Sequence, residues 1–230
     1  MAGKLDTPVK HWNNPFDTSD RKGLILFLWN LSHNFLTLVI ANLLFLLGSL
    51  GVVTIGPSLA ALHYICGQLA AGRPPVYLWR EFWQSFKENF VKGLLAELVF
   101  AAYSFVLWWA LRLLEENGYV GFPLYLLLMI VTLFFLMCYS WVFPQIAMLD
   151  IPLDACFSNA VSLALVRPLH ALGAALISAG LVVGAFFLLP ATLMVYIVLL
   201  FAVAALVKAS FVWPVLERFL VKNDEEDSND

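Results

Sequence analysis

Residues 169–212 read LHALGAALISAGLVVGAFFLLPATLMVYIVLLFAVAALVKASFV, a run in which Lys208 is the one Lys, Arg, Asp or Glu. As a single helix this run would measure about 66 Å at 1.5 Å per residue. The hydrocarbon core of a bilayer is only about 30 Å thick. The run must therefore fold back on itself, and Pro190 marks the turn because proline fits the first turn of a helix. The stretch predicts two transmembrane helices, over 169–189 and 191–212.

The composition of the whole chain agrees with this prediction. Of its 230 residues, 62% are hydrophobic and 13% are charged, against about 45–50% and 25% in soluble domains. These values exclude a soluble globular protein, a disordered chain and a basic nucleic-acid binder. The net charge of −3 is a property of the tail, since five acidic residues lie in 224–230 and the rest of the chain carries +2. The chain is predicted to be a multi-pass, all-α membrane protein.

Four more apolar stretches extend the prediction to six transmembrane helices. A spanning helix needs roughly 20 apolar residues. The stretch over 55–71 is shorter than this and carries Gly56 and Pro57. Residues 1–22 lack the apolar core of a secretory signal, so they are expected to remain as a cytoplasmic segment. Residues 222–230 are expected to form a disordered acidic tail after a single membrane domain over 23–221. The four additional spans are 35–53, 55–71, 94–114 and 122–143.

The positions of Lys and Arg decide whether the short stretch crosses the membrane. Cytoplasmic loops carry an excess of these residues. Four precede the first span and four lie between the second and the third, so both groups share one side only if 55–71 crosses. Six crossings then place both termini in the cytoplasm. The residues of the two groups are Lys4, Lys10, Arg21 and Lys22, and Arg73, Arg80, Lys87 and Lys92.

Two amphipathic segments are predicted to lie along the cytoplasmic surface, over 75–92 and 152–166. In the first, aromatic residues recur at helical spacing opposite a polar side. Its function is open between an interfacial anchor, with the aromatic face in the acyl boundary, and a docking helix for a cytoplasmic partner. Attraction to anionic lipid is expected to be minor because Glu81 and Glu88 offset its basic residues. The aromatic residues are Trp79, Phe82, Trp83, Phe86 and Phe90. The second segment is weaker, with Leu153, Phe157, Val161 and Ala164 on its apolar side.

Four polar residues inside the spans are candidate functional positions, since buried ionisable groups in membranes usually pair or serve a pathway. Glu97 and Lys208 are expected at equal depth. Either they face one another as an ion pair, or Lys208 extends to the inner headgroups while Glu97 takes a hydrogen bond from another helix. Asn42 and His63 would line any polar cavity, although a lone histidine in a helix such as His63 also fits an interhelical hydrogen bond. No catalytic, cofactor or metal motif is recognisable. The chain is therefore not expected to be an enzyme or to hold a metal ion or a cofactor.

Three sequence blocks resemble a known family. They are Asn42-Leu-Leu-Phe-Leu-Leu, then Val53-Thr-Ile-Gly-Pro-Ser-Leu-Ala-Ala-Leu, then Phe82-Trp-Gln-Ser-Phe-Lys-Glu-Asn-Phe. In order and spacing they are similar to the YesL family of bacterial integral membrane proteins, which has no known function. Pro57 stands where many members have Ala or Ser. The resemblance implies a bacterial cytoplasmic membrane and a link to saccharide-uptake transporters, and it supplies no site residues.

Two functions follow as hypotheses. The first is a non-enzymatic accessory or scaffold protein that contacts a transport complex, with the lipid bilayer as its environment. The alternative is a small-solute transporter or channel, in which Asn42, His63, Glu97 and Lys208 line the route. A polar cavity at mid-membrane depth would favour the alternative, and an interior filled with Leu and Phe would disfavour it. The pattern indicates no particular oligomeric state.

Overall fold

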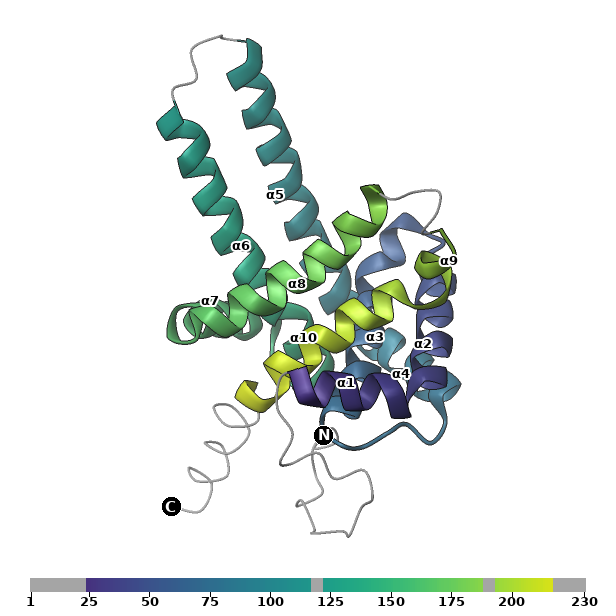
Figure 1. The fold of residues 1–230 in the computed structure, drawn as a ribbon. Helices are drawn as coiled ribbons and strands as arrows, with labels where there is room; N and C mark the ends of the chain where they lie inside the picture. Colours follow the sequence, from purple (N-terminus) through teal and green to yellow (C-terminus); the bar gives the residue numbers. More distant parts are fainter. Residues whose placement is uncertain (1–23, 117–121, 188–192, 217–230) are drawn as a thin grey trace, which may run out of the picture.

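The computed structural model describes residues 24–116, 122–187 and 193–216. Every regular element in these ranges is helical, which confirms the all-α class (Figure 1). The predicted segments 1–22 and 222–230 and the turn at Pro190 lie outside the described residues. The elements are α1 (Leu24–His33), α2 (Phe35–Gly48), the 3-10 turn η1 (Val52–Thr54), α3 (Ile55–Ala70), α4 (Leu78–Glu88), α5 (Phe90–Glu116), α6 (Phe122–Met148), α7 (Leu153–Val166), α8 (Pro168–Phe187), α9 (Leu193–Val195), the π-helical η2 (Tyr196–Leu200) and α10 (Phe201–Leu216).

Several of these helices have the length and composition of membrane spans. Three qualify on their own, over Val52–Ala70, Phe90–Glu115 and Phe122–Met148, and the number rises to five if two bent pairs of helices each count as one span. Val198–Trp213 is a shorter apolar helix. Within the described residues the protein therefore has three to five candidate spans. Compared with the prediction, the helix of the first span ends at Gly48, the third begins at Phe90 and the fourth continues through Pro144 to Met148.

α3 is the central helix of the molecule. It contacts α2, α4, α5, α6 and α10, and its side chains are buried along almost the whole helix. Small residues make this possible, because helices in membranes associate through close packing of Ala, Gly and Ser. Ala60 and Ala61 are fully buried, and the sulfur of Met148 packs against Gly67. Pro57 lies in the first turn of α3, where its missing N–H costs nothing.

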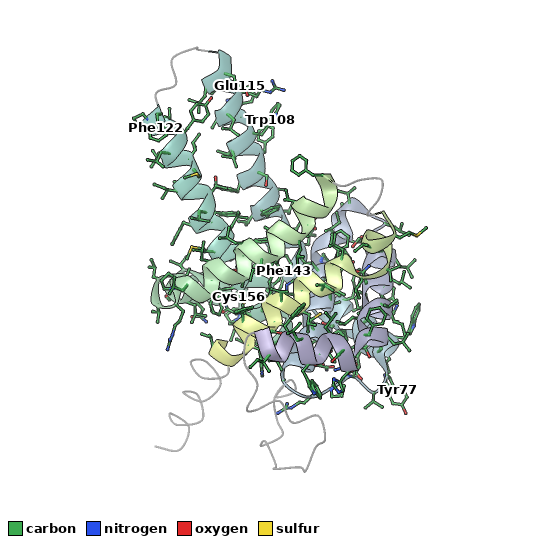
Figure 2. The ribbon with its side chains drawn as sticks, viewed as in Figure 1. Tyr77, Trp108, Glu115, Phe122, Phe143 and Cys156 are labelled. Atoms are coloured by element: carbon green, nitrogen blue, oxygen red, sulfur yellow. The ribbon has the colours of Figure 1, made fainter. Side chains whose placement is uncertain are left out.

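α5 and α6 form a long hairpin that stands out from this body (Figure 1). Each has 27 residues, about 40 Å at 1.5 Å per residue. Aromatic side chains join them: the rings of Tyr103 and Phe135 stack with their centroids 3.8 Å apart, and the Tyr103 hydroxyl donates a hydrogen bond to Thr132. Figure 2 shows Trp108, Glu115 and Phe122 near the free end of the hairpin, whereas Phe143 lies within the body. The outer half of the hairpin exposes apolar side chains on both helices.

Sharp bends separate short helices from the spans that follow them. α1 and α2 meet at 86°, and α7 and α8 at 105°. The sequence predicted no separate helix before residue 35, so α1 is an addition to the prediction. Figure 1 shows α1, α4 and the last turn of α10 towards one end of the molecule, opposite the tips of α5 and α6. Near the beginning of α5, Lys92 donates a hydrogen bond to the carbonyl of Ile151 (2.8 Å) and lies 3.6 Å from the carboxylate of Asp150.

The second predicted interfacial helix exists as α7, and most of its predicted apolar side packs against the protein. Ala164 is buried, and Leu153 and Phe157 pack partly buried against a buried cluster. Val161 is exposed, so the prediction was wrong for this residue. The buried side also includes Cys156, Ala160 and Leu163, because small residues allow α7 to approach α6 and α8 closely.

Candidate functional sites

Glu97 accepts a hydrogen bond from another helix. The backbone N–H of Gly56, in the first turn of α3, donates to its carboxylate. The first N–H groups of a helix have no partner within the helix, and a negative charge near them is favourable because of the helix dipole. No ion pair joins Glu97 to Lys208 in the described part of the chain. Of the two predicted alternatives, the ion pair is therefore wrong, and a hydrogen bond to Glu97 from another helix is observed.

A close approach of two glycines brings α5 to the first turn of α3. A Cβ atom added to Gly93 would lie 2.8 Å from the backbone nitrogen of Pro57, and one added to Gly56 would overlap the carbonyl of Gly93. The two backbones are thus in direct contact. Glu97 follows one turn after Gly93, so this crossing places its carboxylate beside the N–H of Gly56.

Lys208 lies over an aromatic ring. Its ammonium nitrogen is 5.7 Å from the centroid of the Tyr139 ring, within the distance of a cation–π interaction. The ring of Phe100 stacks on the same tyrosine with centroids 4.5 Å apart. Tyr139 therefore lies between Lys208 and α5, the helix that carries Glu97, although Glu97 and Lys208 do not pair.

His63 is buried in α3, with 2% of its surface exposed. Its Nδ1 lies 2.8 Å from the carbonyl oxygen of Leu59, and since a carbonyl only accepts, Nδ1 carries the proton. Nε2 is then the acceptor of the ring, and it is buried without a hydrogen-bond partner. The centroid of its ring lies 5.9 Å from that of Phe143. His63 is thus able to accept a hydrogen bond from water or from a hydroxyl group.

These residues converge from four helices. His63 belongs to α3, Glu97 to α5, Tyr139 to α6 and Lys208 to α10, and we call the four residues the interior cluster. Three of them were predicted from the sequence, and Tyr139 was missed. The signal was available, because a tyrosine within a predicted span must find surroundings for its hydroxyl.

Asn42, the fourth predicted residue, has a different role. Its side-chain oxygen accepts a hydrogen bond from the backbone N–H of Ala202 (3.0 Å), and Asn42 is completely buried. Ala202 lies two residues after the end of the π-helical segment Tyr196–Leu200. Inside a bilayer every backbone polar group needs a partner within the protein. Asn42 therefore joins α2 to α10 and provides a partner for backbone beside the irregular turn.

The predicted docking helix is α4, and most of its aromatic side is turned into the protein. Phe82 is 0% exposed and belongs to the main buried cluster, while Trp83 and Phe86 pack partly buried against that cluster. Phe90 is also partly buried. Trp79 alone of the five is largely accessible, at 61%. The prediction that this side enters the acyl boundary or binds a partner is therefore wrong for Phe82, which packs against the rest of the protein.

Among the described residues, no three His, Cys, Asp or Glu side chains are grouped as a metal ion would require. The described cysteines are all free.

Comparison with known proteins gives one match. Residues 38–111, which extend from α2 into α5, match the model of a family described as "Protein of unknown function, DUF624". This region contains all three sequence blocks that carry the resemblance. No curated protein and no solved structure is significantly similar to the chain.

Proposed function

We propose that this chain, which resembles the YesL family and matches a model of a family of unknown function over residues 38–111, is a non-enzymatic accessory or scaffold protein of a saccharide-uptake transporter complex in a bacterial cytoplasmic membrane. The link to saccharide uptake comes from the family resemblance. Two features of the structure support the proposal. The body around α3 is closely packed, and the hairpin formed by α5 and α6 exposes apolar side chains.

The proposed topology has six crossings, made by α2, α3, α5, α6, α8 and the continuous run from α9 to α10. Successive crossings alternate in direction in Figure 1, which is the arrangement that six crossings require. α1 and the last turn of α10 lie towards the same end, so both termini are proposed to be cytoplasmic. The distribution of Lys and Arg supports the same orientation.

The close packing around α3 is the observation that best supports the accessory function. The two buried clusters are made of Leu, Ala, Phe and other apolar side chains, and Leu59 of α3 packs against both of them. Backbones touch at Gly56 and Gly93, and Met148 fills the space beside Gly67. A body packed in this way holds its shape, because closely packed interiors resist deformation. It suits a scaffold better than a solute pathway that must open and close.

We assign the contact with the transporter to the α5–α6 hairpin. Its outer half exposes apolar side chains from both helices, among them Val106 at 63% and Ile130 at 54%. Helices associate in membranes through packing and shape, since lipid is as apolar as leucine. A hairpin that stands out from its own body can lie along the transmembrane helices of another protein without rearrangement.

The test is co-purification of the transporter after mild solubilisation of cells that produce the tagged full-length chain. Val106→Trp and Ile130→Trp keep the hairpin apolar but add bulk to the proposed contact. Leu43→Trp adds the same bulk to the exposed side of α2 and is the matched control. We expect the hairpin variants to lose the transporter and the control to retain it. Equal retention by all three, or recovery of no transporter subunit with the unsubstituted chain, would refute the proposal.

The interior cluster favours a second candidate, a small-solute transporter. The observation is the buried, unpartnered Nε2 of His63, which is able to accept a hydrogen bond from a hydroxylated solute. Solute flux into proteoliposomes tests this function directly. Flux that is lost in His63→Phe and kept in Leu43→Trp would support it, and no flux for the unsubstituted protein would exclude it.

A further inference from the structure

The outer side of α4 carries a shallow groove of about 500 Å³. Its lining combines two indole rings with two cations and an amide: Trp79, Arg80, Trp83, Gln84 and Lys87. The opposite side of α4 is fixed against α3 and α2 through Phe82. The groove is therefore presented by a helix that is held in place by the body of the protein.

The acidic residues of α4 do not neutralise this groove. Glu81 accepts hydrogen bonds from the backbone N–H groups of Val76 and Tyr77, at 3.0 and 3.1 Å, and so caps the beginning of the helix. Glu88 accepts a hydrogen bond from the side chain of Gln84, at 3.0 Å. Arg80 and Lys87 form no ion pair with any described residue. The net charge of the segment is nearly zero, but its charges are not evenly distributed. Both carboxylates accept hydrogen bonds, and the two cations, Arg80 and Lys87, line the groove.

The aromatic residues define the rest of the chemistry. The rings of Trp79 and Trp83 meet edge to face with centroids 6.0 Å apart, and Trp79 is largely exposed. Tryptophan is enriched at the level of lipid headgroups because its ring is apolar and its N–H is polar. Arginine forms paired hydrogen bonds with phosphate oxygens, and lysine adds a point charge. Indoles beside two cations fit an amphiphile whose anionic group is a phosphate.

We propose that this groove binds the headgroup of an anionic phospholipid from the cytoplasmic leaflet. Arg80 and Lys87 contact the phosphate, Gln84 offers a polar contact to the rest of the headgroup, and the glycerol and upper acyl region lie along Trp79 and Trp83. This proposal departs from the expectation that attraction to anionic lipid is minor. The site depends on the position of α4 at the membrane surface and is independent of any transporter partner.

The experiment uses the purified full-length chain in non-ionic detergent, with phosphatidylglycerol as the probe and phosphatidylcholine as the neutral comparison. Native mass spectrometry measures the bound fraction against lipid concentration. Arg80→Gln and Lys87→Gln are each expected to weaken phosphatidylglycerol binding about fivefold, the effect of one cation near an anionic surface. Arg73→Gln removes the same charge from an exposed position outside the groove, and binding should be unchanged.

Three results would overturn the proposal. One is equal binding of the two lipids. Another is equal weakening by Arg73→Gln, which would indicate attraction by total charge. The third is displacement of phosphatidylglycerol by millimolar inorganic phosphate, which would indicate a site for soluble anions. The melting temperature of each variant without added lipid should match that of the unsubstituted chain, because Arg80 and Lys87 are exposed.

Discussion

Glu97 shows what sequence reasoning can and cannot decide for a single residue. Hydropathy placed it about one turn inside a span and placed Lys208 at a similar depth, and both residues belong to the interior cluster. Depth, however, says nothing about the angle around a helix axis or about which helices are neighbours. The carboxylate therefore bonds to the N–H of Gly56, and the lysine lies over Tyr139.

Separate surroundings for the two charges lead to additive effects. We expect the free energy of unfolding lost in Glu97→Gln and in Lys208→Met to sum in the double variant, with a coupling below about 0.5 kcal/mol. Thermal or denaturant unfolding in detergent measures the three values. A coupling above about 1 kcal/mol would mean that the two side chains interact directly.

The contact between Gly56 and Gly93 gives a second prediction for a single residue. Gly93→Ala places a methyl group 2.8–2.9 Å from backbone atoms of Gly56 and Pro57, so it should cost about 1–3 kcal/mol by overpacking. Gly180→Ala is the control, because nothing lies within 4 Å of that position. Alanine is the better helix former, so the control should be neutral or slightly stabilising. The melting temperatures of the two variants in detergent should move apart accordingly.

For whole elements, the position of α4 was predicted, but the prediction over 75–92 is longer than the observed helix Leu78–Glu88 and includes the beginning of α5. The surroundings of its aromatic side were not predicted. The reason is physical: in a membrane protein, both lipid and a neighbouring helix are apolar, so the same pattern satisfies either. The 3.6-residue period identified the helix and the composition of its two sides. Only the fold shows that α3 and α2 cover Phe82. The turn of π-helix at Tyr196–Leu200 has no sequence signal of this kind.

This placement of α4 predicts unequal effects within one aromatic set. Phe82→Ala removes a fully buried ring and should cost about 3–5 kcal/mol. Trp79→Ala removes a ring that is largely exposed, so its cost in detergent should stay within about 0.5 kcal/mol, as for other surface substitutions. Unfolding monitored by circular dichroism compares the two. Similar losses would show that α4 does not pack on α3 through Phe82.

For the whole molecule, composition alone predicted a membrane protein, and the three short blocks that resemble a known family lie within the region that matches a family model. The number of spans was harder to predict, because a window of apolar residues does not reveal a bend of 86° or 105° between consecutive helices. The segment over 24–33 was missed for that reason. Which ends of the helices share a side of the membrane stays a prediction from the distribution of Lys and Arg.

The proposed topology places the tip of the hairpin and the loop before α4 on opposite sides. Glu115→Cys and Arg73→Cys put single thiols at two exposed positions. A membrane-impermeant maleimide should label the first in intact cells and the second only after permeabilisation. The unsubstituted chain gives the background from its three cysteines. If both positions were labelled in intact cells, they would lie on the same side of the membrane, and the single crossing proposed between them, α5, would be excluded.

The unequal lengths of the helices have a consequence for the surrounding lipid. α2 and α3 have 14 and 16 residues and rise about 21 and 24 Å, whereas the hairpin exceeds the roughly 30 Å of hydrocarbon. On the proposed topology the bilayer must thin beside α2 and regain its normal thickness beside α5 and α6. This mismatch costs a fraction of a kcal/mol per Å, so acyl-chain length becomes a determinant of stability. The protein would then prefer thinner patches of membrane on one flank and ordinary membrane on the other.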